Sequence, residues 1–275
     1  MSELKQDVVC RRKRVVRLQS GEVSLGDFYL NDWVTTDSYA ADSVVSMAWE
    51  RLRSFFLSNP TSFASLVYSI GLYNMYVKEV WNVVNVSIGY RHDDPVFQTP
   101  DFWLLPNETW ALRYGDCEDT TFLLLSSTLN LKRSWADTVS RESVEYGVIG
   151  FYRDYSGTYY GHAFIIRSSS RIAGGRWLWV ETTLDYAVPQ QIWYAWNPNI
   201  LVPVYWFDGS KTYRVDKDYS VLGLTSDYVK RHESYIRAMI EYVETGRWTS
   251  VKWLHKKRRP ARVDEGVEVV YVSTG

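Results

Sequence analysis

Cys117 stands in the segment Gly-Asp-Cys-Glu-Asp, directly before a run of mostly apolar residues. A thiol attacks a carbonyl carbon as a thiolate, so its pKa must be low or a base must stand beside it. Asp116 is a suitable N-cap, which puts Cys117 in the first turn of the helix that follows. There the helix dipole and the free N–H groups favour an anion. The sequence therefore predicts that Cys117 is a nucleophile.

Acidic residues on both sides of Cys117 oppose its ionisation. Asp116, Glu118 and Asp119 bring like charge close to a thiolate, and like charge raises the pKa of a thiol. A histidine that pairs with the thiolate would have to outweigh them. The chain has four histidines: His92 in a loop-like stretch, His162 in an alternating stretch, His232 on the expected exposed face of the last helix, and His255 in a basic tail.

His162 is the histidine best placed to act on Cys117. If residues 168–175 form a hairpin loop, Arg167 pairs with Arg176, and this register sets His162 opposite Glu181. A carboxylate in that position holds an imidazole ring and supports its charged form. A histidine in a strand is more often structural than catalytic, so an ion pair at the edge of a sheet remains the alternative.

The elements that must position these residues follow from hydrophobic periodicity. Apolar residues at helical spacing predict helices, and alternation predicts strands that begin near residue 144. Asp154-Tyr155-Ser156-Gly157 is a turn signal between the first two strands. Residues 89–115 are loop-like, with a short helical turn near 108–112. We expect helices over 38–57, 61–86, 120–129 and 227–244, and strands over 144–152, 158–167, 176–183, 202–207 and 211–215.

These elements predict an α+β fold in which helices pack on an antiparallel sheet. We expect three parts: a basic N-terminal arm over 1–37 containing a short strand, a catalytic core over 38–215, and a C-terminal helix with a basic tail over 216–275. The aromatic content of 16%, with 13 Trp and 21 Tyr, predicts a large aromatic core. A peptide or sugar groove lined by rings is the alternative.

Composition narrows the functional class. A hydrophobic content of 46% excludes a disordered chain, and a net charge of -1 gives no overall attraction to nucleic acid or membrane. No apolar run approaches the ~20 residues of a membrane span. The polar N-terminus lacks the pattern of a signal peptide. With two cysteines and no disulfide framework, we expect a soluble protein in a reducing compartment, either cytoplasmic or associated with a virion.

Three blocks in this order resemble the motifs of transglutaminase-like proteases, and the closer match is to the bacterial transglutaminase-like cysteine proteinases. The resemblance spans roughly residues 80–185 and also includes segments before the cysteine. The blocks are Gly115–Asp119, Gly161–Phe164 and Trp179–Thr183, and the earlier segments are Val84–Asp93, Asp101–Trp103 and Pro106–Thr109.

This resemblance implies a papain-like fold with a Cys-His-acid triad. It makes Cys117 the nucleophile, His162 the general base and acid, and Glu181 the carboxylate that orients the imidazole. The backbone N–H of Cys117 would hold part of the oxyanion. The family usually has Asp where this chain has Glu181, and Asp185 is a second candidate for the acid.

In some of these proteinases the acids that flank the cysteine bind calcium. The residues in those positions here are Asp116 and Glu118. A calcium ion would neutralise the charges that oppose ionisation of Cys117. No other cofactor is expected.

The expected activity is hydrolysis of a peptide or amide bond through an acyl-enzyme, with a protein or peptide as the substrate. An amine acceptor in place of water would make the chain a protein crosslinker. A structural or assembly protein on the same fold, for instance in a virion, is the alternative, motivated by the basic runs Arg11–Arg17 and Lys256–Arg262. Nucleic-acid binding is not expected, because those runs lack interleaved aromatic residues. The sequence leaves the oligomeric state open.

Overall fold

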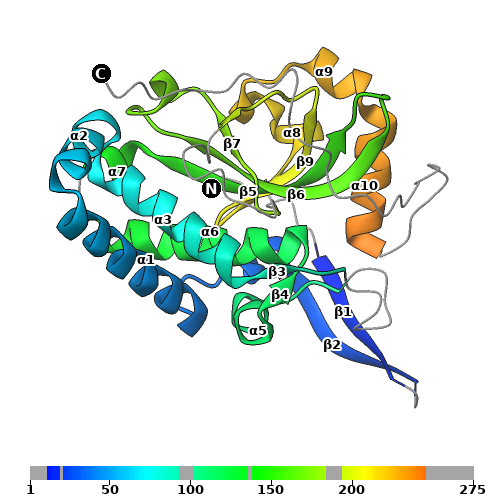
Figure 1. Cartoon of the computed structure of the whole chain (residues 1–275). Helices are drawn as coiled ribbons and strands as arrows, with labels where there is room; N and C mark the ends of the chain where they lie inside the picture. Colours follow the sequence, from blue (N-terminus) through cyan, green and yellow to red (C-terminus); the bar gives the residue numbers. More distant parts are fainter. Residues whose placement is uncertain (1–10, 19–20, 93–101, 136–137, 184–193, 246–275) are drawn as a thin grey trace, which may run out of the picture.

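The computed structural model describes residues 11–18, 21–92, 102–135, 138–183 and 194–245. A layer of helices lies against a twisted sheet, with further short helices at the C-terminal end of the described chain (Figure 1). Helix α6, Cys117–Ser134, packs directly on the two central strands of the sheet. The predicted α+β class, with helices packed on an antiparallel sheet, is confirmed.

The main sheet has six strands in the order β10-β9-β5-β6-β7-β8, and every pair of neighbours is antiparallel. The central hairpin turns at Asp154, where the expected turn lies. The N–H of Asp154 donates to the carbonyl of Thr158 at 2.9 Å, and its Oδ1 accepts from the N–H of Thr158 at 2.9 Å. The strands are β5 Val144–Arg153, β6 Tyr159–Ser168, β7 Leu178–Val180, β8 Tyr194–Ala195, β9 Leu201–Phe207 and β10 Thr212–Arg214.

The register between β6 and β7 differs from the prediction by two residues. Arg167 pairs with Leu178 rather than with Arg176. His162 is therefore not the cross-strand partner of Glu181. Because side chains alternate with a period of two, a shift of two residues leaves every side chain on its predicted face.

The loop between β6 and β7 explains the shift. Ser169 forms a bridge with Ile172, and the 3-10 turn Ala173–Gly175 extends the connection. Gly174 and Gly175 have φ of 61° and 78°, which only glycine adopts readily. The loop therefore has a structure of its own, and the paired part of β7 begins later than the sequence pattern predicts.

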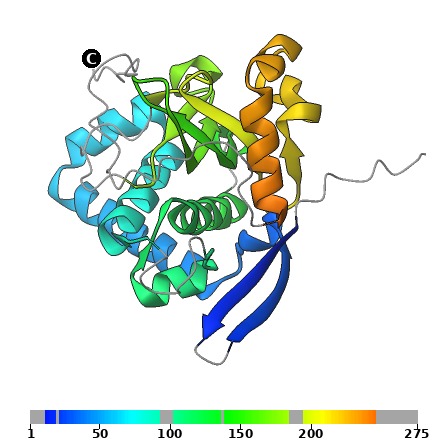
Figure 2. The same cartoon turned by 90° about the vertical axis from the view of Figure 1, so that its right-hand side faces the viewer.

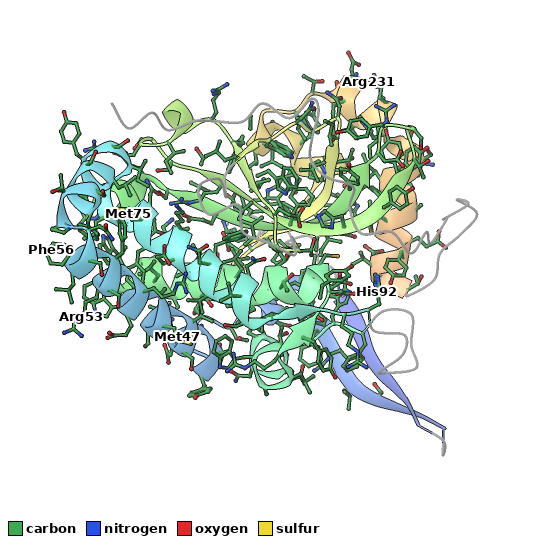
Figure 3. The ribbon with its side chains drawn as sticks, in the orientation of Figure 1. Met47, Arg53, Phe56, Met75, His92 and Arg231 are labelled. Atoms are coloured by element: carbon green, nitrogen blue, oxygen red, sulfur yellow. The ribbon has the colours of Figure 1, made fainter. Side chains whose placement is uncertain are left out.

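Helix α1, Tyr39–Ser58, begins as predicted, because the Ser38 side chain accepts from the N–H of Ala41 at 3.2 Å. Met47, Arg53 and Phe56 project from its outer side (Figure 3), while its apolar face packs on α6 and on the helix of residues 72–87.

The single helix predicted over 61–86 is two helices. Helix α2 spans Pro60–Ile70, and α3 spans Leu72–Ser87. Gly71 separates them with φ 82° and ψ 149°, a conformation outside any helix. The apolar periodicity continues across Gly71, so the pattern alone does not reveal the break.

The N-terminal segment forms a hairpin where the sequence predicted a single short strand. Strand β1, Arg11–Leu18, pairs with β2, Gly21–Tyr29, and the hairpin projects from the body of the molecule (Figure 1). The 3-10 turn η1, Leu30–Trp33, then enters the core, where Trp33 has no exposed surface.

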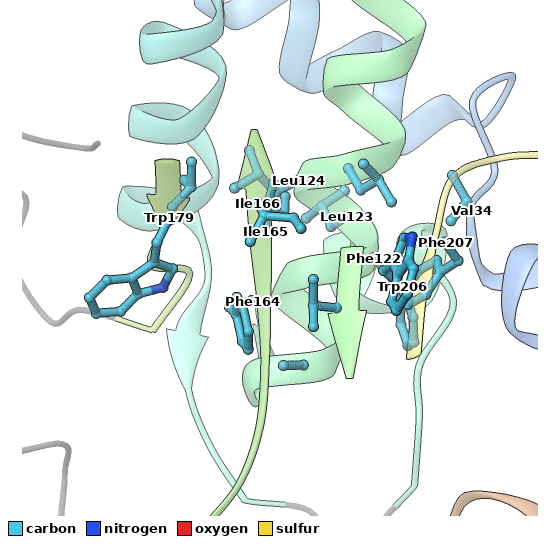
Figure 4. Close-up of a cluster of buried hydrophobic side chains, with 14 of the residues drawn as sticks. Val34, Phe122, Leu123, Leu124, Phe164, Ile165, Ile166, Trp179, Trp206 and Phe207 are labelled. Atoms are coloured by element: carbon cyan, nitrogen blue, oxygen red, sulfur yellow. The ribbon is translucent and has the colours of Figure 1, made fainter. Parts of the chain in front are cut away.

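The aromatic core predicted from the composition lies between α6 and the sheet (Figure 4). Trp33 packs on Phe122 with ring centroids 5.8 Å apart, and Phe122 packs on Phe207 at 5.7 Å. Trp103 meets the edge of Trp33 at 5.3 Å. This cluster fixes α6 against both the sheet and the N-terminal turn.

The C-terminal helix predicted over 227–244 is also two helices. Helix α9 spans Ser226–Arg231 and α10 spans Glu233–Thr245, and His232 lies between them. The prediction that His232 is exposed was wrong, because only 6% of the residue is accessible. Its Nδ1 lies 3.0 Å from the carbonyl oxygen of Tyr228. The turn of the chain therefore buries this histidine.

Helix α10 stands at one edge of the molecule, close to the hairpin and beside strand β9 (Figure 2). Short elements complete the described chain. They are α5 Pro106–Leu112, α7 Thr138–Glu142, α8 Val215–Asp218, η2 Ala173–Gly175 and η3 Tyr219–Leu222, and the two-residue strands β3 Gly89–Tyr90 and β4 Tyr114–Gly115. Among the helices of the described ranges, none combines the length and the apolar character that crossing a membrane requires.

Candidate active site

Cys117 is the first residue of α6, and Asp116 is its N-cap, as the sequence predicts. Asp119 secures this start of the helix. Its Oδ2 accepts from the N–H of Asp116 at 3.2 Å, and its Oδ1 accepts from the N–H of Leu104 at 2.7 Å. The carboxylate of Asp119 therefore links the first turn of α6, which carries Cys117, to the preceding loop.

Gly115 leaves room for this arrangement. A Cβ at Gly115 would lie 2.6 Å from Cβ of Asp119 and 2.8 Å from its Oδ2. Gly115 also pairs with Tyr90 in the parallel two-stranded pair of β3 and β4. A glycine is therefore required here by close packing rather than by a special φ.

His162 and Glu181 are in direct contact. Nε2 of His162 lies 3.1 Å from Oε2 of Glu181, and both side chains are largely shielded from water, with 13% and 4% exposed. The ring of His162 also stacks on Phe164 with centroids 5.9 Å apart. The predicted meeting of this imidazole with this carboxylate is therefore present, although the predicted strand register is not.

The other oxygen of Glu181 is held by its own chain. Oε1 accepts from the N–H of Thr182 and the N–H of Thr183, both at 2.9 Å, and from the hydroxyl of Thr183 at 2.7 Å. The indole N–H of Trp81 donates to the Glu181 carbonyl at 2.6 Å. These bonds fix the carboxylate in one orientation, with Oε2 turned to the histidine.

Two opposing effects act on the pKa of Glu181. Burial raises the pKa, but the charge of His162 and hydrogen bonds from His162 and Thr183 outweigh burial, so the pKa lies below its ordinary value. Glu181 is therefore a carboxylate at neutral pH and can support a positive charge on the imidazole.

Cys117 lies beside the chain neighbours of both residues. The backbone N–H of Ala163 hydrogen-bonds to the sulfur, which favours the thiolate. The hydroxyl of Thr182 lies 3.4 Å from the Cys117 carbonyl and 3.3 Å from the hydroxyl of Thr121. The start of α6 therefore lies next to both β6 and the residues that follow β7.

The thiol itself is held in its protonated form. The sulfur of Cys117 donates to Oε2 of Glu118 at 2.8 Å. Burial raises the pKa of the Cys117 thiol well above its ordinary value, and the charges of Glu118 and Asp116 raise it further. The opposition expected from the flanking acids is therefore present in the structure.

Asp116, Cys117 and Glu118 form a cluster that could hold a cation, since one ligand atom from each lies within 4.8 Å of the others. Calcium prefers six to eight oxygen ligands, whereas thiolate sulfur suits softer metals. The two carboxylates offer oxygen ligands of the kind that calcium prefers, and the others would have to come from backbone oxygens or water.

Tyr90 is a neighbour of the site that the sequence reasoning missed. Burial around its hydroxyl raises the pKa of Tyr90, and negative charges near it raise the pKa further. Those charges belong to Cys117, Asp116, Glu118 and Glu181. A resemblance block runs through Tyr90, but no residue pattern within the block distinguishes this tyrosine.

Among the described residues, no hydrogen bond or ion pair joins His92 or His232 to Cys117, His162 or Glu181. His92 is exposed, and its ring meets the edge of Tyr90 with centroids 5.1 Å apart. His232 lies against Tyr228 and Tyr159, between α9 and α10. Asp185, His255, Cys10 and the basic tail fall outside the described residues.

Comparisons with known proteins give distant likenesses to solved structures alone. No family model matches the chain, and no curated protein matches it. Among solved structures, Legionella pneumophila LapG is 17% identical with a TM-score of 0.35, over 70% of this chain and 96% of that chain. A likeness of this size does not identify corresponding residues or an activity.

Proposed function

We propose that the chain is a transglutaminase-like cysteine hydrolase that cleaves a peptide or amide bond through an acyl-enzyme on Cys117. The observation that carries this proposal is the 3.1 Å contact between Nε2 of His162 and Oε2 of Glu181. An oriented imidazole and carboxylate, together with a thiol at a helix N-terminus that accepts a hydrogen bond from the residue after His162, are the parts that nucleophilic acyl transfer needs.

In the proposed reaction, His162 first takes the proton of the Cys117 thiol. Because Glu181 engages Nε2, the other ring nitrogen, Nδ1, is the one available to the thiol. The thiolate attacks the carbonyl carbon, and the imidazolium returns the proton to the leaving amine as the C–N bond breaks. Water, deprotonated by the same imidazole, then hydrolyses the thioester and restores the thiol.

Glu181 takes the role in which the resembling family usually has Asp. Leu178, Trp179 and Val180 pair with β6 in a register that leaves Glu181 without His162 as its direct partner. The carboxylate must therefore reach along the strand to the ring. The additional methylene of Glu supplies that reach, which favours a working triad with this residue.

We further propose that Asp116 and Glu118 hold a calcium ion. The two acids both raise the pKa of the Cys117 thiol in the absence of a cation. Calcium, when bound, supplies positive charge that favours the thiolate. Glu118 would then accept from Cys117 less readily, and the thiol proton would be available to His162.

A second candidate is a structural or assembly protein on the same fold, without catalysis. The contact between the Cys117 sulfur and Glu118 favours it, because this contact keeps the thiol protonated. An acyltransferase that accepts an amine in place of water is a variant of the first proposal and uses the same residues.

Acylation of Cys117 by p-nitrophenyl acetate separates these candidates. A hydrolase releases p-nitrophenolate in a burst and carries an acetyl group on Cys117, detected by peptide mass spectrometry. Cys117→Ser and His162→Ala should lose the burst. Faster turnover with added glycine ethyl ester would indicate the acyltransferase. Acetylation of native Cys117 no faster than in the urea-unfolded chain would overturn the enzyme proposal.

A further inference from the structure

Arg14 is a buried cation in the N-terminal hairpin of β1 and β2. Strand β1 has a β-bulge between Arg14 and Val15, and Gly26, the cross-strand partner of Arg14, has a φ of 116°, which favours glycine. A bulge turns a side chain away from the direction that regular alternation would give it. The Arg14 side chain is only 5% exposed. The bulge therefore directs this arginine into the body of the molecule.

Three side chains surround the Arg14 guanidinium. Its Nη2 donates to Oε2 of Glu108 at 2.7 Å. Its central carbon lies 5.3 Å from the ring centroid of Phe28 and 4.9 Å from that of Phe102. A guanidinium that leaves water needs a charged partner, and the faces of aromatic rings also attract it. Through Phe102 and Glu108, Arg14 contacts both the loop before α5 and α5 itself.

Glu108 links Arg14 to the start of α5. The oxygen that accepts from Arg14, Oε2, also accepts from the N–H of Leu105 at 2.6 Å. Leu105 is the N-cap of α5 and Glu108 is the third residue of the helix, a position from which a carboxylate commonly accepts from the N-cap N–H. Arg14 therefore holds the carboxylate that fixes the start of α5.

Leu104, which precedes Leu105, is bound to the turn that carries Cys117. Its N–H donates to Asp119, and the same carboxylate accepts from the N–H of Asp116. Two consecutive amides are thus held by carboxylates, one in α6 and one beside Arg14. Hydrogen bonds of this kind are stronger than those between neutral groups. These contacts form a continuous path from the hairpin to the N-cap of α6.

We infer that Arg14 is a positioning residue of the candidate active site, which holds residues 102–105 in the place that sets the first turn of α6. This inference rests on the proposed function. Arg14 does not touch the reacting atoms and acts through Glu108 and Asp119. Because a small displacement of a reacting group slows a reaction greatly, the hairpin supports the reactivity of Cys117 as well as the fold.

Hydrogen exchange of single amides, followed by NMR, tests the path without an assay of activity. Arg14→Met removes the cation and keeps an apolar stem. We expect the amides of Leu104, Leu105 and Asp116 to exchange about tenfold faster or more, since a hydrogen bond between charged groups is lost. Acylation of Cys117 by p-nitrophenyl acetate should also slow by about tenfold or more.

Arg51→Met is the matched control. It breaks an ion pair that joins α1 to α3, in which Nε of Arg51 lies 2.9 Å from Oε2 of Glu79. It should change neither the exchange of the three amides nor the rate of acylation. Arg14→Lys keeps a cation beside Glu108 and should have a smaller effect than Arg14→Met on both measurements. If Arg14→Met does not fold, Arg14→Lys carries the same test.

Three results would overturn the inference. The first is faster exchange confined to the hairpin, with Leu104, Leu105 and Asp116 at their wild-type rates, because Arg14 would then stabilise the hairpin alone. The second is faster exchange of these amides with acylation at the wild-type rate. The third is an Arg14→Lys variant as impaired as Arg14→Met. If wild type shows no burst, the proposed function fails instead, and the exchange rates still show whether Arg14 fixes the turn.

Discussion

The carboxylate of Glu181 meets Nε2 of His162 at 3.1 Å, although the two residues are not cross-strand partners. The contact spans the end of β7, where the chain leaves the sheet. Donors from Thr182 and Thr183 hold the carboxylate in place at that point. The residues directly after β7 therefore bring Glu181 to His162, whereas the sequence analysis expected strand pairing to do so.

This contact makes stability depend on pH. The pKa of Glu181 is lowered in the folded chain, so its stabilisation is complete above the ordinary value of 4.5 and is lost as pH falls through the folded value. Glu181→Gln should lower the free energy of unfolding by about 2 kcal/mol at neutral pH, because a buried charged acceptor loses its partners. Urea titrations followed by Trp fluorescence should show the difference shrinking in acid. A difference that stays constant with pH would contradict this assignment.

A second buried carboxylate, Glu145, joins the sheet to the helices. Its Oε1 accepts from Nε of Arg167 at 3.1 Å, and its Oε2 lies 3.3 Å from Nζ of Lys132. Glu145→Ala leaves the buried guanidinium uncompensated and should cost about 3–5 kcal/mol of unfolding free energy. Thermal or urea unfolding measures this cost.

The control for Glu145 is Glu233→Ala, which removes an exposed helical pair with Arg237 at 2.6 Å. Exposed pairs of this kind contribute about 0.3–0.5 kcal/mol. Equal losses of unfolding free energy in the two variants would show that the buried ion pairs of Glu145 stabilise the fold no more than an exposed pair does.

Replacing Gly115 should disturb the first turn of α6, which carries Cys117. The Cβ of Gly115→Ala would meet Asp119 at 2.6 Å and displace the carboxylate that accepts from Asp116 and Leu104. Alkylation of Cys117 by iodoacetamide should therefore change by about tenfold or more, since small misplacements of a reacting group carry large costs.

Gly89→Ala is the matched control, because Gly89 lies in the partner strand and the nearest atom to a Cβ there is 3.7 Å away. This variant should keep the wild-type rate of alkylation. A wild-type rate in Gly115→Ala would show that Asp119 does not position the turn.

Calcium binding is tested without any assay of activity. Isothermal titration with calcium chloride should detect binding to wild type and a loss of affinity in the double variant Asp116→Asn, Glu118→Gln. A matched change of two acids away from the site, Asp216→Asn with Asp218→Asn in α8, should leave the affinity unaltered. If the first double variant binds as wild type does, the two acids are not ligands.

Local signals predicted the parts of the site that depend on local chemistry. The N-cap before Cys117 and the turn at Asp154 were readable because each depends on a few consecutive residues. The break at Gly71 was not readable, because apolar spacing continues across it. A glycine inside a helical pattern is more often tolerated than not.

The sequence does not reveal which residues far apart in the chain come together in the fold. The register of β7 depends on a loop with its own bridge and turn, which a count of loop residues does not reveal. Tyr90 reaches the site through strands of two residues each, too short to leave a periodic pattern. Its part in the site emerges only when the chain is folded.

The most direct test of the account is the reactivity of Cys117 towards iodoacetamide at neutral and at mildly acidic pH, with calcium chloride present. If His162 and Cys117 form an ion pair, alkylation should remain rapid in acid and should slow greatly in His162→Ala. The unfolded chain in urea supplies the rate of an ordinary thiol. Alkylation of the native protein no faster than that rate, or unaffected by loss of His162, would contradict the proposed active site.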